Sequence, residues 1–86
     1  MTVNTRHLDY AIKLLSGTAA AKRAPRKAQV NVVLTVFSIG YSIQINNRLV
    51  KDVLSCEDPG REGAAAAQES IRAAEALGKT TSLEIY

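Results

Sequence analysis

The stretch 57-EDPGREGAAAAQES-70 determines how the second half of the chain folds. It holds a proline, two glycines around a charged pair, and then a run of alanines. Asp58 is a good N-cap residue, Pro59 stands where its missing N–H does no harm, and Glu62 falls in a first turn that favours negative charge. The pattern predicts a helix with this apolar stripe: Ala64, Ala67, Ile71, Ala74 and Leu77.

The same stretch has the glycine spacing of known phosphate-binding loops. A P-loop needs Lys and Ser/Thr after its second glycine, but Ala64 and Ala65 follow here, and the third glycine of a Rossmann fingerprint is missing. The GXXG loop of KH domains joins two helices, whereas a strand is expected just before this segment. Glu62 inside the loop would also repel a phosphate. The sequence therefore predicts that Gly60–Gly63 only begins a helix.

Before this stretch, residues 29–56 alternate with the period of β-strands. Apolar residues fall on both faces of the first strand: Val30, Val32, Leu34 and Val36 on one, Val33, Phe37 and Ile39 on the other. This predicts a central strand covered on both faces, or covered on one of them by a second copy of the protein. A second strand over Tyr41–Ile45 leads to Asn46-Asn47, a type I′ turn signal, and a return strand is expected over Arg48–Cys56.

The two ends of the chain add one helix and one strand. Asn4 or Thr5 can cap a first helix, Gly17 can end it, and its apolar stripe is Leu8, Ala11, Ile12 and Leu15. After Gly78, the alternation of residues 80–86 predicts a last strand.

These elements predict an α+β fold in a single domain, residues 1–86. The expected order is a helix, a three-strand antiparallel meander, a helix packed on the sheet and a fourth strand (αβββαβ). A right-handed helical crossover makes the fourth strand parallel to the third, and the expected sheet order is 4-1-2-3.

Charge is distributed unevenly along the chain. The net charge is +3, but residues 1–56 carry eight Lys/Arg against two Asp, and residues 57–86 carry three against six acids. Residues 18–28 contain Pro25 and a run of like charges, which predicts an exposed, mobile basic loop. The predicted contacts to phosphates or to an acidic protein surface are Lys22, Arg23, Arg26 and Lys27, helped by Arg48 and Lys51. The alternative is an ordinary solvated loop.

Catalytic chemistry has little support in the sequence. His7 is the only histidine, and Asp9 lies on a different face of the expected helix. Cys56 has Glu57 and Asp58 beside it, which raise rather than lower a thiol pKa. One Cys and one His far apart do not make a metal site. We expect a protein that is not an enzyme and needs no cofactor or metal.

The compartment and assembly follow from composition. A single cysteine excludes an internal disulfide, the N-terminus lacks an apolar signal core, and no apolar run approaches the ~20 residues of a membrane span. These features predict a cytoplasmic protein without a membrane partner. The doubly apolar first strand and the free sheet edges predict a homodimer or pairing with another chain.

The strand Tyr41–Ile45 with the hairpin that follows it, the Asp58-Pro59-Gly60 turn residues and the alanine-rich helix resemble small phage-encoded anti-CRISPR proteins of type I systems, over residues 41–78. The resemblance implies a non-enzymatic inhibitor in a bacterial host's cytoplasm that binds a CRISPR surveillance complex and blocks DNA binding or nuclease recruitment. It carries over no individual binding residue. The alternative is a small basic regulatory module that binds nucleic acid directly.

Overall fold

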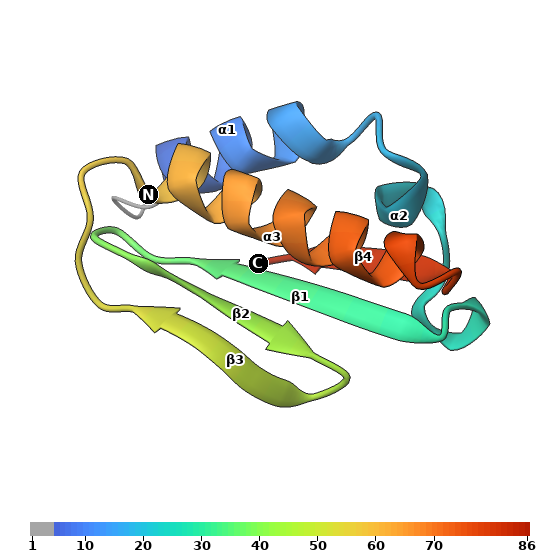
Figure 1. The fold of residues 1–86 in the computed structure, drawn as a ribbon. Helices are drawn as coiled ribbons and strands as arrows, with labels where there is room; N and C mark the ends of the chain where they lie inside the picture. The colour runs from blue at the N-terminus through green and yellow to red at the C-terminus, as the bar shows by residue number, and fades with distance from the viewer. Residues whose placement is uncertain (1–4) are drawn as a thin grey trace.

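A computed structural model describes residues 5–86 (Figure 1). The elements along the chain are α1 (Thr5–Leu15), α2 (Ala19–Lys22), the 3-10 turn η1 (Pro25–Lys27), β1 (Val30–Val36), β2 (Tyr41–Ile45), β3 (Arg48–Val53), α3 (Pro59–Ala76) and β4 (Thr81–Ile85). The first helix begins at Thr5, and the predicted cap at Asn4 lies outside the described residues.

The four strands form one sheet in the order β3-β2-β1-β4. β1 pairs antiparallel with β2, and β2 pairs antiparallel with β3. β4 pairs parallel with β1, because α3 carries the chain across the sheet and returns it in the direction of β1. The predicted α+β class and strand order are confirmed, but the sheet as a whole is mixed rather than an antiparallel meander.

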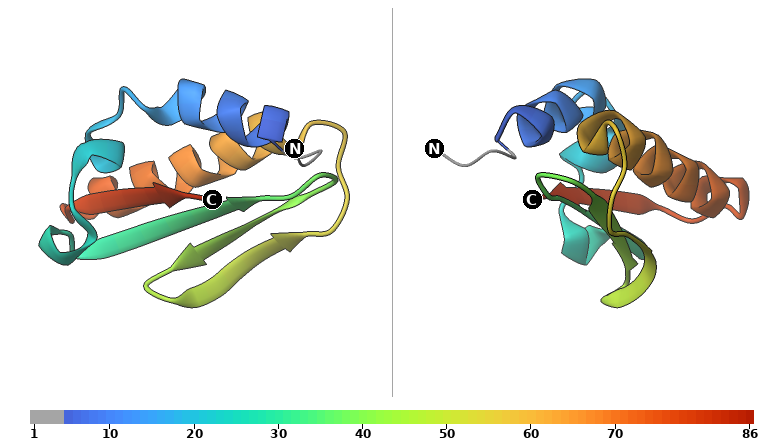
Figure 2. Two further views of the ribbon diagram at one scale, coloured as in Figure 1. Left: turned by 180° about the vertical axis from the view of Figure 1, so that it is seen from behind. Right: turned by 90° about the vertical axis from the view of Figure 1, so that its left-hand side faces the viewer.

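Both long helices lie on one side of the sheet (Figures 1 and 2). α3 runs over β1 and β2, and α1 packs beside α3. On β1 the alternate residues Val32, Leu34 and Val36 are buried beneath the helices, while Val33 on the opposite face is only half-buried. The prediction that protein layers cover both faces of this strand is therefore wrong for the single chain. Cover by a second copy stays a prediction.

The hairpin between β2 and β3 has the predicted turn, with positive φ at Asn46 (51°) and Asn47 (68°). The Asn46 side chain also holds the turn against the start of β1, because its Oδ1 accepts from the Asn31 amide at 2.8 Å. β3 ends at Val53 rather than at the predicted Cys56. An irregularity opposite Ile43/Gln44 interrupts its pairing with β2.

The start of α3 is built as the sequence predicts. The Asp58 carboxylate accepts from the Arg61 amide at 3.3 Å, and the Glu62 carboxylate accepts from the Asp58 amide at 3.2 Å, so the two side chains cap the helix reciprocally, with the acid one position later than in a capping box. A Cβ on Gly60 would lie 2.4 Å from the His7 carbonyl oxygen, and one on Gly63 would lie 3.0 Å from Leu34 Cδ1. The two glycines therefore allow α3 to pack closely on α1 and on the sheet.

Residues 18–28 differ from the expected mobile loop. Thr18 caps α2 by accepting from the Ala21 amide at 3.2 Å, and Ala20 is fully buried. Three consecutive alanines favour a helical turn, and Pro25 begins a second turn, η1, instead of opening an irregular segment. The segment is thus folded against β4, although its cationic side chains at 22, 26 and 27 are exposed.

Two residues of the predicted apolar stripes are not buried. Leu77 follows the last residue of α3 and is 75% exposed, and Ile12 on α1 also faces solvent. Periodicity identifies the apolar face of a helix, but it does not show which part of that face extends beyond the rest of the core. The exposed position of Leu77 becomes important for the groove described below.

Candidate functional site

Cationic side chains from separate elements meet at the end of the sheet where β1 and β4 begin. The Gln29 amide donates to Thr80 Oγ1 at 3.0 Å and the Thr80 amide donates to Gln29 Oε1 at 3.2 Å, so Lys79 lies beside the end of η1. Asn46 Nδ2 donates to the Gln29 carbonyl at 3.4 Å, which places the start of β3 at the same end. We call this group the basic end: Lys22, Arg23, Arg26, Lys27, Arg48 and Lys79.

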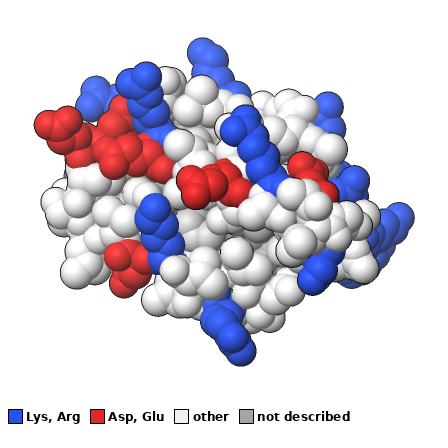
Figure 3. All heavy atoms as spheres, viewed as in Figure 1, with Lys and Arg blue, Asp and Glu red and all other residues white. Residues whose placement is uncertain are grey.

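Five of these six side chains are free to contact a partner. Lys22, Arg26, Lys27, Arg48 and Lys79 are exposed, and within residues 5–86 none of them forms an ion pair or a side-chain hydrogen bond. Figure 3 shows blue side chains over much of this face, several of them along its right side, and the largest red group at the upper left. Unpaired cations gathered in this way produce a positive field that attracts anionic partners.

Arg23 has a different role from its neighbours. It is half-buried, and its guanidinium donates to the Thr81 carbonyl at 2.5 Å. Thr81 Oγ1 in turn donates to a carboxylate oxygen of Glu75 at 3.3 Å. Arg23 therefore ties the turn after α2 to the start of β4 and contributes more to the fold than to a contact surface.

Lys51, the remaining predicted contact, lies away from the basic end. It stands opposite Ile43, part-way along the edge strand β3, and its Nζ is 5.9 Å from the centre of the Tyr41 ring. Lys79 replaces it as a member of the group, and sequence reasoning missed this residue. The parallel crossover was the available signal, because it brings the residue before β4 to the start of β1.

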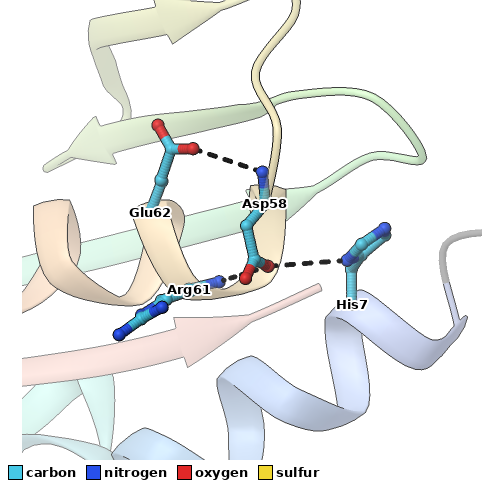
Figure 4. A network of polar contacts seen from close by, with 4 residues as sticks. All are labelled: His7, Asp58, Arg61 and Glu62. Atoms are coloured by element: carbon cyan, nitrogen blue, oxygen red, sulfur yellow. Dashed lines mark hydrogen bonds and ion pairs between the residues drawn. The ribbon is translucent and has the colours of Figure 1, made fainter.

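The opposite end of the molecule is acidic and surrounds the start of α3. Figure 4 shows Asp58 between the Arg61 amide and His7, whose Nδ1 is 3.8 Å from Asp58 Oδ1. An open cleft here is lined by Arg6, His7, Tyr10, Glu57 and Asp58. His7 is thus half-buried, with Asp58 rather than Asp9 as its acidic neighbour. Since the Asp58 carboxylate already caps α3, its position is explained by the fold.

Cys56 lies next to this acidic end. Its partial burial, together with the negative charges of Glu62 and Asp58, raises the pKa of the thiol above its ordinary value of 9.0. A thiol in this setting stays protonated at neutral pH, and the thiolate is the reactive form. The surroundings are those of a structural cysteine.

Residues 5–86 lack two further kinds of feature. They contain no cluster of three or more His, Cys, Asp or Glu side chains that could hold a metal ion. Within the same residues, no helix has the length and apolar character that crossing a membrane requires. What the arrangement at the basic end can do chemically is bind anionic groups.

Comparison with protein-family models, with curated proteins and with solved structures finds no match to this chain. The residues themselves therefore carry the functional argument.

Proposed function

We propose that this protein is a non-enzymatic inhibitor that binds a nucleic-acid-processing protein complex, as phage anti-CRISPR proteins bind CRISPR surveillance complexes. The observation that carries the proposal is the basic end, where five exposed and unpaired cations from separate elements meet. Cations held on a folded framework lose less entropy on binding than cations on a mobile loop.

A protein partner is favoured over naked nucleic acid by the residues beside Arg48. Leu49 and Val50 follow it on β3 and are 54% and 51% exposed. Protein interfaces combine apolar contacts with Arg and a polar rim, whereas phosphate contacts gain nothing from exposed leucine and valine. A cationic surface with apolar neighbours fits an acidic surface of such a complex, away from the basic surface that binds DNA.

Co-purification tests the proposal. The tagged protein is incubated with purified type I CRISPR surveillance complexes, and retained subunits are identified by mass spectrometry. The variant K22Q/R26Q/K27Q/R48Q should lose retention, while R6Q/K13Q/R61Q/R72Q, which removes the same charge elsewhere, should keep it. Failure of the unchanged protein to retain any subunit, or equal loss in both variants, would contradict the proposal.

A second candidate is a small regulatory module that binds nucleic acid directly. The exposure of Lys22, Arg26 and Lys27 on consecutive turns, α2 and η1, favours it. Gel shifts over a salt series distinguish the two functions, because each phosphate contact on duplex DNA contributes a slope of about −0.9 in log affinity against log salt. Strong, salt-sensitive binding to naked DNA or RNA supports the module, and its absence supports the inhibitor.

A further inference from the structure

A groove opens between α3 and the β2–β3 hairpin, on the helix side of the sheet. Its apolar lining includes Ile45 from β2, Ala73 and Ala74 from α3, and Leu77 directly after that helix, with Glu69 and Lys79 also at its wall. The groove exists because alanines on this side of α3 are too short to reach β3, which lies at the edge of the sheet beyond the helices.

The groove presents apolar surface that the chain itself does not cover. Leu77 is 75% exposed, Ala73 is exposed, and Ile45 is only half-buried. Five of the six residues of β3 are exposed as well, so no side chain from the edge strand closes the groove. Apolar surface of this kind, rimmed by charged residues, is typical of interaction sites.

The charges around the groove are mainly positive. Lys79 lines it directly, and Arg48 stands opposite Ile45 in the β2–β3 pairing, so the two share a face of the sheet. Lys51 stands opposite Ile43 on that same face. Glu69 is the one acid in the lining of the groove within residues 5–86. The groove therefore complements a segment that combines apolar and acidic side chains.

The free strand edges are poorly suited to adding a strand from a partner. Pairing along β3 is irregular at Val50, and the charged Lys51 and Asp52 follow, two features that protect edges from strand addition. On the outer edge of β4, Arg23 already occupies the Thr81 carbonyl. A peptide segment of a partner is therefore better bound through its side chains in the groove than through strand addition at an edge.

We propose that this groove binds an acidic amphipathic helix of a partner protein. Leucine-like side chains at positions i, i+3, i+4 and i+7 of the helix enter the groove between Ala73, Leu77 and Ile45. Carboxylates on its flanks face Arg48 and Lys79. This inference deepens the proposed function and rests on it for the nature of the partner, a protein.

A fluorescein-labelled helical peptide with leucines at those spacings and glutamates elsewhere serves as the probe, with fluorescence anisotropy as the readout. The full chain should bind it, and Ala73→Glu should weaken binding by about tenfold or more, because it fills the groove and repels the peptide. Ala65→Glu adds the same side chain at another exposed position of α3 outside the groove and should change little. If Ala73→Glu unfolds the protein by circular dichroism, Leu77→Ser takes its place.

Three results would contradict the proposed peptide site. The first is equal binding of a peptide with lysines in place of the glutamates, and the second is an equal loss of binding in Ala73→Glu and Ala65→Glu. The third is displacement of the labelled peptide by an oligonucleotide but not by excess unlabelled peptide. The proposed function fails separately. If the protein retains a surveillance complex but does not bind the peptide, only the proposed peptide site is wrong. If it binds the peptide but retains no complex, only the proposed inhibitor function is wrong.

Discussion

Gly60 and Gly63 control how closely the start of α3 approaches its neighbours. The three atoms nearest to a Cβ on Gly60 belong to the backbone of His7, whereas those nearest to a Cβ on Gly63 are side-chain atoms of Leu34 and Tyr41. A backbone contact can be relieved only by moving α1, while side chains can shift locally. The pair that resembles a phosphate-binding loop in the sequence is therefore explained by packing.

We expect Gly60→Ala to destabilise the protein by about 1–3 kcal/mol, because its Cβ would overpack against α1. Gly63→Ala should cost less, since Leu34 and Tyr41 can adjust and alanine is favoured over glycine in a helix by about 0.5–1 kcal/mol. Gly17→Ala is the control, because nothing lies within 4 Å of its Cβ. Urea unfolding measures all three free energies, and equal effects at the three positions would contradict this account.

Cys56 gives a prediction about pH. Burial first, and then Glu62, raise the pKa of its thiol, so the folded chain keeps this proton where the unfolded chain loses it. Folding stability contributed by this group should therefore fall as pH rises above 9.0, the ordinary thiol value. The midpoint of iodoacetamide alkylation against pH should lie higher in the folded protein than in urea.

Glu62→Gln should lower that midpoint, because it removes a negative charge while the glutamine side-chain oxygen can still accept from the Asp58 amide. Glu69→Gln, two turns further along α3, should leave the midpoint unchanged. An unshifted midpoint in Glu62→Gln would show that Glu62 does not control the thiol.

At the level of elements, local signals predicted most of the fold. Asn46-Asn47 and Asp58-Pro59 define a turn and a helix start by backbone chemistry alone, and both are where the sequence places them. The turns within residues 18–28 were not predicted, because the run of like charges there favours a loop. These turns form because Ala20 is buried against the rest of the fold, a tertiary contact that the local sequence does not show. The position of both helices on one side of the sheet could not be read from β1, whose two faces are both partly apolar.

Arg23 tests whether α2 is held in place by its contact with β4. Arg23→Ala should destabilise the protein by about 1–2 kcal/mol, because the Thr81 carbonyl loses a charged donor in a partly buried setting. Lys22→Ala, next to it but exposed, should change stability by less than about 0.5 kcal/mol. Chemical unfolding curves measure both. Equal, negligible effects would mean that this hydrogen bond does not hold the segment.

Over the whole molecule, the charge asymmetry of the sequence is only partly kept in space, since Glu75 of the acidic half contacts Thr81 at the basic end. Lys79 from the acidic half of the chain joins the basic end through the parallel pairing of β4. Arg6 from the basic half lines the cleft at the acidic end. The sequence predicted five residues of the basic end but not Lys79, because Lys79 lies there only through the pairing of β4 with β1. Nor could it predict the groove, which depends on how far the helices extend over the sheet.

Cation-exchange chromatography tests this spatial clustering without any partner. The variant K22Q/R26Q/K27Q/R48Q and the variant R6Q/K13Q/R61Q/R72Q lose the same four charges, so their net charges are equal. A sulfonate resin responds to the densest positive surface rather than to net charge, because clustered cations engage neighbouring sulfonates together. The first variant should elute at clearly lower salt than the second, with both giving the circular dichroism of the unchanged protein. Identical elution of the two variants would mean that the basic end is not a distinct electrostatic surface.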